Sequence, residues 1–322
     1  MAARPQPGAE PAPRSGRGPA AGGGAPPARG RRRARAGRRD PWPWFALPAI
    51  AFVLIFFAAP FVLNAGFAFS DWSGFSDEIS FNGLDNFRAL IDQDLFVNAV
   101  KVTVLYALVT LVLQTAISLP LALMLVENSR INTVFRSLFF VPVLISPLAA
   151  GYVWKGLLAP DGPINGAIAF VLPGGFDWNW LGEPSTALPA VALIDAWKWS
   201  GLITLVYIAG LKAIPKEMIE AAMLDGAGAF QRFWRIRLRL LAPAMTFNVA
   251  VTLVGALSAY DVVAATTGGG PGDHTTTLNV AMRGQWGQSF FGPASALSLT
   301  VTALVIVTAV PLVAWLRRRE VA

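Results

Sequence analysis

The chain has 322 residues, of which 54% are hydrophobic and only 14% are charged, a composition too apolar for an ordinary soluble domain. It contains no cysteine and a single histidine, His274, which excludes disulfides and thiolate metal sites and leaves little room for histidine-based catalysis. We therefore expect a membrane protein with no metal site and no catalytic residue.

The first 40 residues consist mainly of Gly, Ala, Pro and Arg, and they hold ten of the 26 Lys and Arg residues of the chain. Such a segment cannot bury enough apolar surface to order itself, so residues 1–40 are predicted to be a disordered basic tail. The net charge of +7 reflects this tail. A position beside anionic lipid explains the basic charge of the tail better than nucleic-acid binding does, so no nucleic-acid partner is expected.

Residues 41–322 are predicted to form one all-α transmembrane domain. A helix needs about 20 apolar residues to cross a bilayer, and the sequence offers six runs of suitable length. The predicted spans cover residues 44–70, 97–126, 137–158, 186–212, 240–264 and 292–316. A shorter apolar patch at 162–176 is interrupted by Gly and Pro, so it is expected to lie at the membrane interface.

The basic residues predict the orientation of these spans. If the tail is cytoplasmic, the cytoplasmic segments hold 21 of the 26 Lys and Arg residues, while the remaining regions hold 12 of the 19 acidic residues. This distribution satisfies the positive-inside rule. We expect a multi-pass protein of a bacterial inner membrane with both termini in the cytoplasm.

The longest cytoplasmic loop, residues 213–239, reads as two helices. The stretch "IPKEMIEAAMLDG" predicts a helix over 215–225, because Pro215 is tolerated at its start and Gly226 ends it. Ala221 and Ala222 keep the helix thin enough for another protein to approach, and Met218, Ile219 and Met223 add adaptable apolar contacts. The stretch "AFQRFWRIRLRLLAP" predicts a second, basic amphipathic helix that ends at Pro243. The loop is therefore predicted to dock a partner.

The spacing of Glu220, Ala221, Ala222, Gly226, Ile236 and Leu238 resembles the EAA signature of binding-protein-dependent ABC importer permeases. One position departs from the family pattern, because Arg239 stands where the family usually has Pro. Other stretches resemble the carbohydrate branch of this family, the maltose and glycerol-3-phosphate type. These are "FNGLDNF" at 81–87, "FFVPVLISPLAAGYVWKGLL" at 139–158, "AWKWSGL" at 196–202, "IAGLKAIPKEMIEAAMLDGA" at 208–227 and "TTGGGPGDHTTTL" at 266–278.

The resemblance implies the architecture of an ABC type I importer permease with a cytoplasmic coupling helix. It further implies three partners: a second permease subunit, a dimer of ABC ATPase subunits, and an extracytoplasmic solute-binding protein that delivers a carbohydrate. The chain has no GxxxxGK[ST] phosphate loop, so ATP would be bound by the partner ATPase and the chain itself needs no cofactor.

The resemblance also assigns roles in the coupling loop. The expected ATPase-coupling residues are Met218, Glu220, Ala221, Ala222, Met223, Asp225 and Gly226. ATP-driven closure of the ATPase dimer would reach the pathway through the 215–225 helix and switch it from inward-open to outward-open. Glu220 is the expected anchor of this relay, either by pairing with a basic group of the ATPase or by fixing the loop. The alternative is an exposed helical glutamate without consequence.

Charged residues inside the predicted spans are candidates for the solute pathway, because a charge in a bilayer is costly and usually faces a bundle interior or a cavity. Asp195 and Lys198 are three residues apart on one helical face, where they could also form a structural ion pair. Neighbouring Trp197 and Trp199 could stack on a carbohydrate ring. Asp261 near the outer end of the fifth span is a further candidate, which could equally shape the outer loop.

Two other functions fit parts of the sequence. An ion-coupled secondary transporter of a small polar solute would also have several spans with intramembrane charges, but no inverted repeat is visible and the docking loop would lack a purpose. A membrane-embedded enzyme would need His, Asp or Glu clustered at one membrane depth, which this sequence does not offer. His274 is expected to lie on the surface of an outer loop.

Overall fold

The computed structural model describes residues 42–76, 78–172 and 176–320. The tail predicted to be disordered, 1–40, lies outside the described residues. The backbone contacts divide the chain into two units, one ending at Ala51 and one beginning at Phe52. Apart from a single antiparallel bridge between Ser70 and Phe81, the regular structure of the described residues is entirely helical.

Helix α1 (Trp42–Val53), the π-helical turn η1 (Leu54–Ala58) and α2 (Ala59–Phe67) follow one another without a gap and account for the first predicted span. The helix ends three residues before the predicted boundary, because the chain turns at Ser70 to pair with Phe81. Neither η1 nor α2 contains a buried residue, and α2 packs against the last helix of the chain. The apolar surface of this span thus remains largely open.

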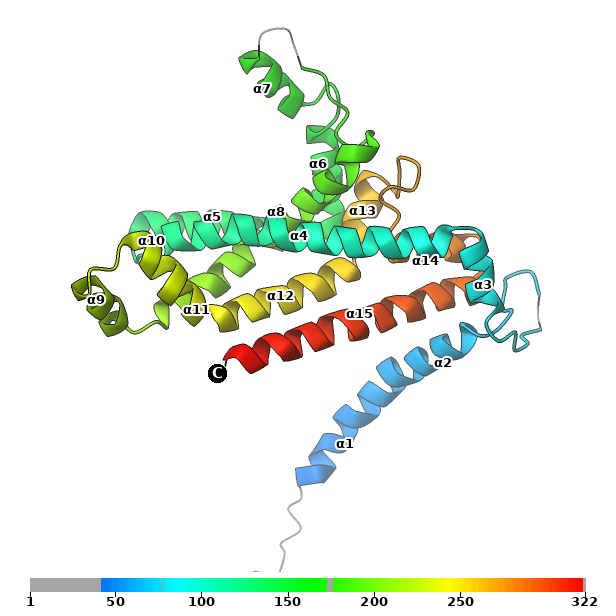
Figure 1. Ribbon diagram of the computed structural model, residues 1–322. Helices are drawn as coiled ribbons and strands as arrows, with labels where there is room; N and C mark the ends of the chain where they lie inside the picture. Colours follow the sequence, from blue (N-terminus) through cyan, green and yellow to red (C-terminus); the bar gives the residue numbers. More distant parts are fainter. Residues whose placement is uncertain (1–41, 77, 173–175, 321–322) are drawn as a thin grey trace, which may run out of the picture. The chain divides into compact units, whose positions relative to one another are not determined.

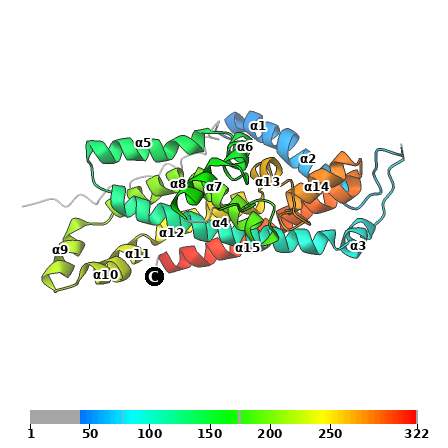
Figure 2. The ribbon, with the colours of Figure 1, turned by 90° about the horizontal axis from the view of Figure 1, so that it is seen from above.

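Four helices, α4 (Leu95–Leu125), α8 (Pro184–Lys212), α12 (Ala242–Leu257) and α15 (Phe291–Glu320), pack into a bundle (Figures 1 and 2). Helix α8 contacts α4, α12 and α5 (Arg130–Leu144), and 67% of its most apolar window is buried, against 17% for α15. Helices α4, α8 and α15 coincide within a few residues with the second, fourth and sixth predicted spans. Helix α8 is the centre of the bundle.

The third predicted span, 137–158, is not one straight helix. Helix α5 ends at Leu144, and α6 (Pro147–Leu157) starts after a bend of 102°. Pro147 has no amide hydrogen to continue the α5 ladder, and the side chain of Ser146 caps the new helix by accepting a hydrogen bond from the Ala149 amide at 3.1 Å. The prediction missed a bend that these two residues could have indicated.

The fifth predicted span, 240–264, is also wrong at its C-terminal end. Helix α12 stops at Leu257, and the chain crosses a short break before α13 (Asp261–Thr266), which packs against α6. At its N-terminal end, α12 meets the helical path α10 (Ala229–Arg232), η2 (Phe233–Arg237) and α11 (Leu238–Leu240) at 64°. In the part of the chain that the structure describes, four helices are long and apolar enough to cross a membrane, and the number of spans rises to at most six if each bent pair is one span.

The two ends of the bundle carry different elements. Helices α9 (Lys216–Leu224), α10 and α11 lie at one end, where α15 also ends (Figures 1 and 2). Helices α3 (Asp85–Asp92) and α14 (Leu278–Gly287) lie at the opposite end. The predicted interfacial patch contains a short helix, α7 (Pro163–Val171). The predicted coupling loop and the C-terminal end of α15 thus share one side of the bundle.

Hydrogen bonds between side chains tie α4, α8 and α12 together. The hydroxyl of Ser118 on α4 donates to the Ser200 carbonyl on α8 at 3.1 Å. The Asn248 amide on α12 donates to the Tyr207 hydroxyl on α8 at 2.8 Å and to the Thr115 hydroxyl on α4 at 2.9 Å. Each such bond satisfies a polar group that would otherwise face hydrocarbon, and each contributes on the order of 1 kcal/mol.

Backbones of α5 and α8 come into contact at Gly201. A Cβ atom at this position would overlap the carbonyl oxygen of Phe139 on α5. The obstacle is main chain, so it cannot be relieved by a rotamer change. Only glycine allows α8 to approach α5 at this distance.

We predict that Gly201→Ala lowers the stability of the purified protein by about 2 kcal/mol or more, because the helices must separate to admit the methyl group. The measurement is the thermal unfolding midpoint in detergent. Gly284→Ala is the matched control, since a Cβ atom at Gly284 in α14 meets no heavy atom within 4 Å. Equal midpoints for the two variants would contradict the close α5–α8 contact.

Candidate functional site

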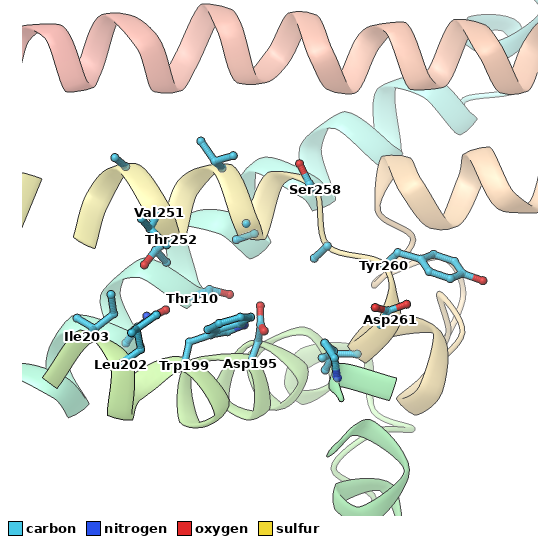
Figure 3. Close-up of a pocket in the computed structure, with 18 residues that line it drawn as sticks. Thr110, Asp195, Trp199, Leu202, Ile203, Val251, Thr252, Ser258, Tyr260 and Asp261 are labelled. Atoms are coloured by element: carbon cyan, nitrogen blue, oxygen red, sulfur yellow. The ribbon is translucent and has the colours of Figure 1, made fainter. Parts of the chain in front are cut away.

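A cavity of about 630 Å³ lies between α4, α8 and α12, next to the break that leads into α13. Its volume is in the range of small-molecule pockets, about 300–1,000 Å³. Figure 3 shows the lining side chains. The polar and aromatic members of the lining are Thr110, Gln114, Asp195, Trp199, Thr252, Ser258, Tyr260 and Asp261.

Asp195 and Trp199 extend from α8 toward α12 and line the same cavity (Figure 3). They are four residues apart, so consecutive turns of α8 place them on one face. The Asp195 carboxylate is buried and accepts a hydrogen bond from the Tyr106 hydroxyl on α4 at 3.0 Å. The carboxylate thus has a fixed position at the cavity wall, beside an aromatic ring.

Lys198 does not pair with Asp195 in the way their spacing allowed. Its ammonium group donates to the Val143 carbonyl at 3.3 Å and lies 4.2 Å from the centroid of the Trp199 ring. Among the described residues, the only ion pair within 4.0 Å joins Arg88 and Asp85. Lys198 therefore neutralises the carbonyl end of α5, where the helix is interrupted, and it is absent from the cavity lining.

Trp197 contacts a different neighbour from Trp199. Its ring packs edge-on against Trp154 of α6, with centroids 5.3 Å apart, and it does not line the cavity. Of the five pathway candidates, the structure brings Asp195, Trp199 and Asp261 to one cavity and leaves Trp197 and Lys198 outside its lining.

Asp261 lies at the other end of the cavity from the α8 residues, beside Tyr260 (Figure 3). It is exposed and occupies the first turn of α13. The break after α12 brings this carboxylate to the cavity, which a continuous fifth span to residue 264 would not have done.

The sequence prediction missed the polar residues that α4 and α12 contribute to the cavity. Thr110 and Gln114 are buried on α4, and Thr252 and Ser258 come from α12 and its C-terminal end. A signal was present, since Thr110, Gln114 and Ser118 recur every four residues in an otherwise apolar span.

A second surface is formed by α9, whose bounds confirm the helix predicted over 215–225. Gly226 has φ +80°, its amide donates to the Met223 carbonyl at 3.1 Å, and the Ala227 amide donates to the Ala222 carbonyl at 2.9 Å. These two bonds form a Schellman motif, which ends the helix at a left-handed glycine. The Schellman motif thus determines where α9 ends.

The residues predicted to couple to an ATPase are distributed around α9. Met218 and Met223 are 46% and 51% exposed, Glu220 is exposed as well, and Ala222 is buried. A groove of about 750 Å³ separates α9 from the bundle, and Glu220, Met223 and Arg237 are among the residues that line it. On its exposed side, α9 therefore presents apolar and acidic side chains that another protein could contact.

Other predicted features can be located as well. His274 is exposed, and its Nδ1 lies 3.0 Å from the Gly272 carbonyl, as expected of a surface residue. Within residues 42–76, 78–172 and 176–320, no group of three or more His, Asp or Glu side chains could hold a metal ion.

Residues 95–320 match the family described as binding-protein-dependent transport system inner membrane component. The chain is 31% identical to the trehalose/maltose transport system permease protein MalF of Thermococcus litoralis, over 81% of this chain and 88% of that protein. It is 33% identical to the sn-glycerol-3-phosphate transport system permease protein UgpA of Brucella abortus, over 82% of this chain and 90% of that protein.

The fold is similar to that of a solved structure, a chain of the bacterial alginate ABC transporter in complex with alginate pentasaccharide-bound periplasmic protein. The TM-score is 0.72 at 22% identity, and the alignment covers 88% of this chain and 96% of that chain. The TM-score therefore shows that the two chains share a fold.

We predict that Gly226→Ala opens the last turn of α9, because an L-residue at a left-handed φ costs about 1–2 kcal/mol. Hydrogen exchange of the α9 amides should become about tenfold faster. Gly228→Ala is the control, since Gly228 lies two residues away at φ −67°. Unchanged exchange in Gly226→Ala would show that the cap does not stabilise the helix end.

Proposed function

The chain belongs to the family of binding-protein-dependent transport system inner membrane components, and from this premise we propose that it is the permease subunit of an ATP-driven importer for a carbohydrate. An extracytoplasmic solute-binding protein would deliver the solute at the α3 and α14 end of the bundle. An ATPase dimer would dock at the α9 end. The chain itself is a pore-forming subunit and not an enzyme.

One observation carries the carbohydrate assignment, namely the juxtaposition of Asp195 and Trp199 in the cavity. A carbohydrate presents hydroxyl groups at its edges and C–H groups on its faces. The carboxylate accepts hydrogen bonds from hydroxyls, and the indole face stacks on C–H groups. The relative named for trehalose and maltose transport supports this class.

The cavity would be one half of the pathway. A second permease subunit would supply the other half, as in an importer built from two permeases. The breaks after α5 and α12 support this arrangement, because they place Pro147, Ser258 and Asp261 at the cavity and leave the outer part of each span free to move separately. Closing of the ATPase dimer would then switch the cavity from the inner to the outer side.

Docking of the ATPase is assigned to α9. Its exposed methionines offer adaptable apolar contact, and Glu220 is available for a basic group on the partner because it forms no ion pair among the described residues. The Schellman motif at Gly226 would keep the helix short and rigid enough to transmit motion to the bundle. ATP would be bound and hydrolysed by this partner, with no cofactor in the permease.

The orientation follows from the same assignment. Helix α9 and the end of α15 lie at one end of the bundle, so an ATPase docked on α9 puts the C-terminus in the cytoplasm. The excess of Lys and Arg in the cytoplasmic segments supports this orientation and places the N-terminal tail on the same side.

The assembly can be tested by purifying the chain from its native host in mild detergent and identifying the accompanying proteins by mass spectrometry. The proposal predicts a second permease and an ATPase with a phosphate-binding loop. Recovery of the chain alone under several detergents, with uptake that follows an ion gradient and is insensitive to ATP depletion, would instead indicate a secondary transporter.

We predict that Glu220→Ala in the assembled complex reduces solute-stimulated ATP hydrolysis by about tenfold or more, because the loss of a charge-assisted contact uncouples the subunits. Glu217→Ala is the control, since Glu217 is also exposed and lies on the same short helix. ATPase activity of Glu220→Ala at the wild-type level would remove Glu220 from the relay.

We predict that Trp199→Ala reduces carbohydrate uptake by about tenfold, because the stacking surface is lost from the cavity. Trp197→Ala removes an equal side chain that lies outside the lining, so it should reduce uptake much less. Membrane insertion of both variants is measured separately by quantitative blotting of membranes. Similar uptake by both at equal insertion would contradict a role of the cavity in transport.

A further inference from the structure

The cavity between α4, α8 and α12 contains acidic side chains and no basic one. Asp195 and Asp261 line it, while no Lys, Arg or His is found among the lining residues within the described part of the chain. We propose that this cavity admits neutral carbohydrates and excludes anionic ones such as sugar phosphates and uronates. The inference rests on the proposed function and narrows the solute class of the same cavity.

Lys198 could have reduced the negative charge of the cavity, because it follows Asp195 by three residues. Its ammonium group is instead held by the Val143 carbonyl at 3.3 Å and by the face of Trp199 at 4.2 Å. The side chain is 1% exposed and does not reach the lining. A solute anion could bind this ammonium only if both contacts were broken.

Helix ends next to the cavity do not supply a site for an anion. Backbone amides at a helix N-terminus attract anions when they are free. Pro147 at the start of α6 has no amide hydrogen, and the Ala149 amide already donates to the Ser146 hydroxyl. At the start of α13, Asp261 supplies a carboxylate of the chain itself. The C-terminal end of α12 adds partial negative charge from its carbonyl groups.

A neutral, hydroxyl-rich solute fits these same groups. Its hydroxyls can donate hydrogen bonds to the carboxylates of Asp195 and Asp261, which both line the cavity. An anionic solute would face like charges in a partly desolvated space, which weakens its binding by about tenfold or more.

The test uses cells that make the complete transporter with its binding protein, partner permease and ATPase. ATP-dependent uptake is measured for the neutral sugars maltose and trehalose and for the anions sn-glycerol 3-phosphate and digalacturonate. We expect uptake of a neutral sugar and at least about tenfold slower uptake of both anions. Faster or comparable uptake of an anion would overturn the charge inference while leaving the proposed function intact.

A different outcome would contradict the proposed function. If the assembled complex hydrolyses ATP but takes up none of the four solutes or any other carbohydrate of a wider panel, the function fails, and the charge inference fails with it.

Removing the two carboxylates tests whether the discrimination between neutral and anionic solutes arises in the cavity. In Asp261→Asn, and more strongly in the double variant with Asp195→Asn, the ratio of anion uptake to neutral-sugar uptake should rise by about tenfold, because the repulsion is lost. The exposed Asp261 can be changed alone without disturbing the buried hydrogen bond of Asp195. Asp92→Asn, an exposed acid on α3, is the control. An unchanged ratio in Asp261→Asn and in the double variant would overturn the proposal.

Discussion

A polar group inside a bilayer has no water to bond, so the charged and phenolic groups of α8 need partners within the protein. Asp195 bonds to Tyr106 of α4, Lys198 to the Val143 carbonyl of α5, and Tyr207 to Asn248 of α12. These contacts explain why α8 lies at the centre of the bundle. They also determine that the Asp195 carboxylate faces the cavity and that the Lys198 ammonium group does not.

The same requirement gives the helix breaks their role. Breaking a helix in a membrane frees carbonyl and amide groups, and the chain compensates them with its own side chains: Lys198 at the end of α5 and the Ser146 hydroxyl at the start of α6. The breaks in turn open the wall of the cavity and admit Asp261. An uninterrupted set of six helices would not have this opening.

The hydrophobic composition was enough to predict an all-α membrane protein. The lengths of the apolar runs were enough to predict the approximate bounds of α4, α8 and α15. The cap of α9 could also be predicted, since a left-handed glycine is a local requirement. Spacing could not predict the partners of Asp195 and Lys198, because their positions on α8 do not say which of α4 and α5 lies nearest. The lining residues Thr110 and Gln114 share a helical face with Ser118 at a spacing of four residues, but this spacing does not say what the face lines.

The central claim is that solute passes through the cavity between α4, α8 and α12. The chain has no cysteine, so Ser258→Cys introduces a single thiol into the lining. Its labelling by a membrane-impermeant maleimide is measured in the assembled transporter with and without the transported sugar, alongside Ser298→Cys on α15, which is outside the lining. The account predicts that the sugar slows labelling at position 258 and not at 298. Labelling at 258 that ignores the sugar, or equal protection at both positions, would contradict it.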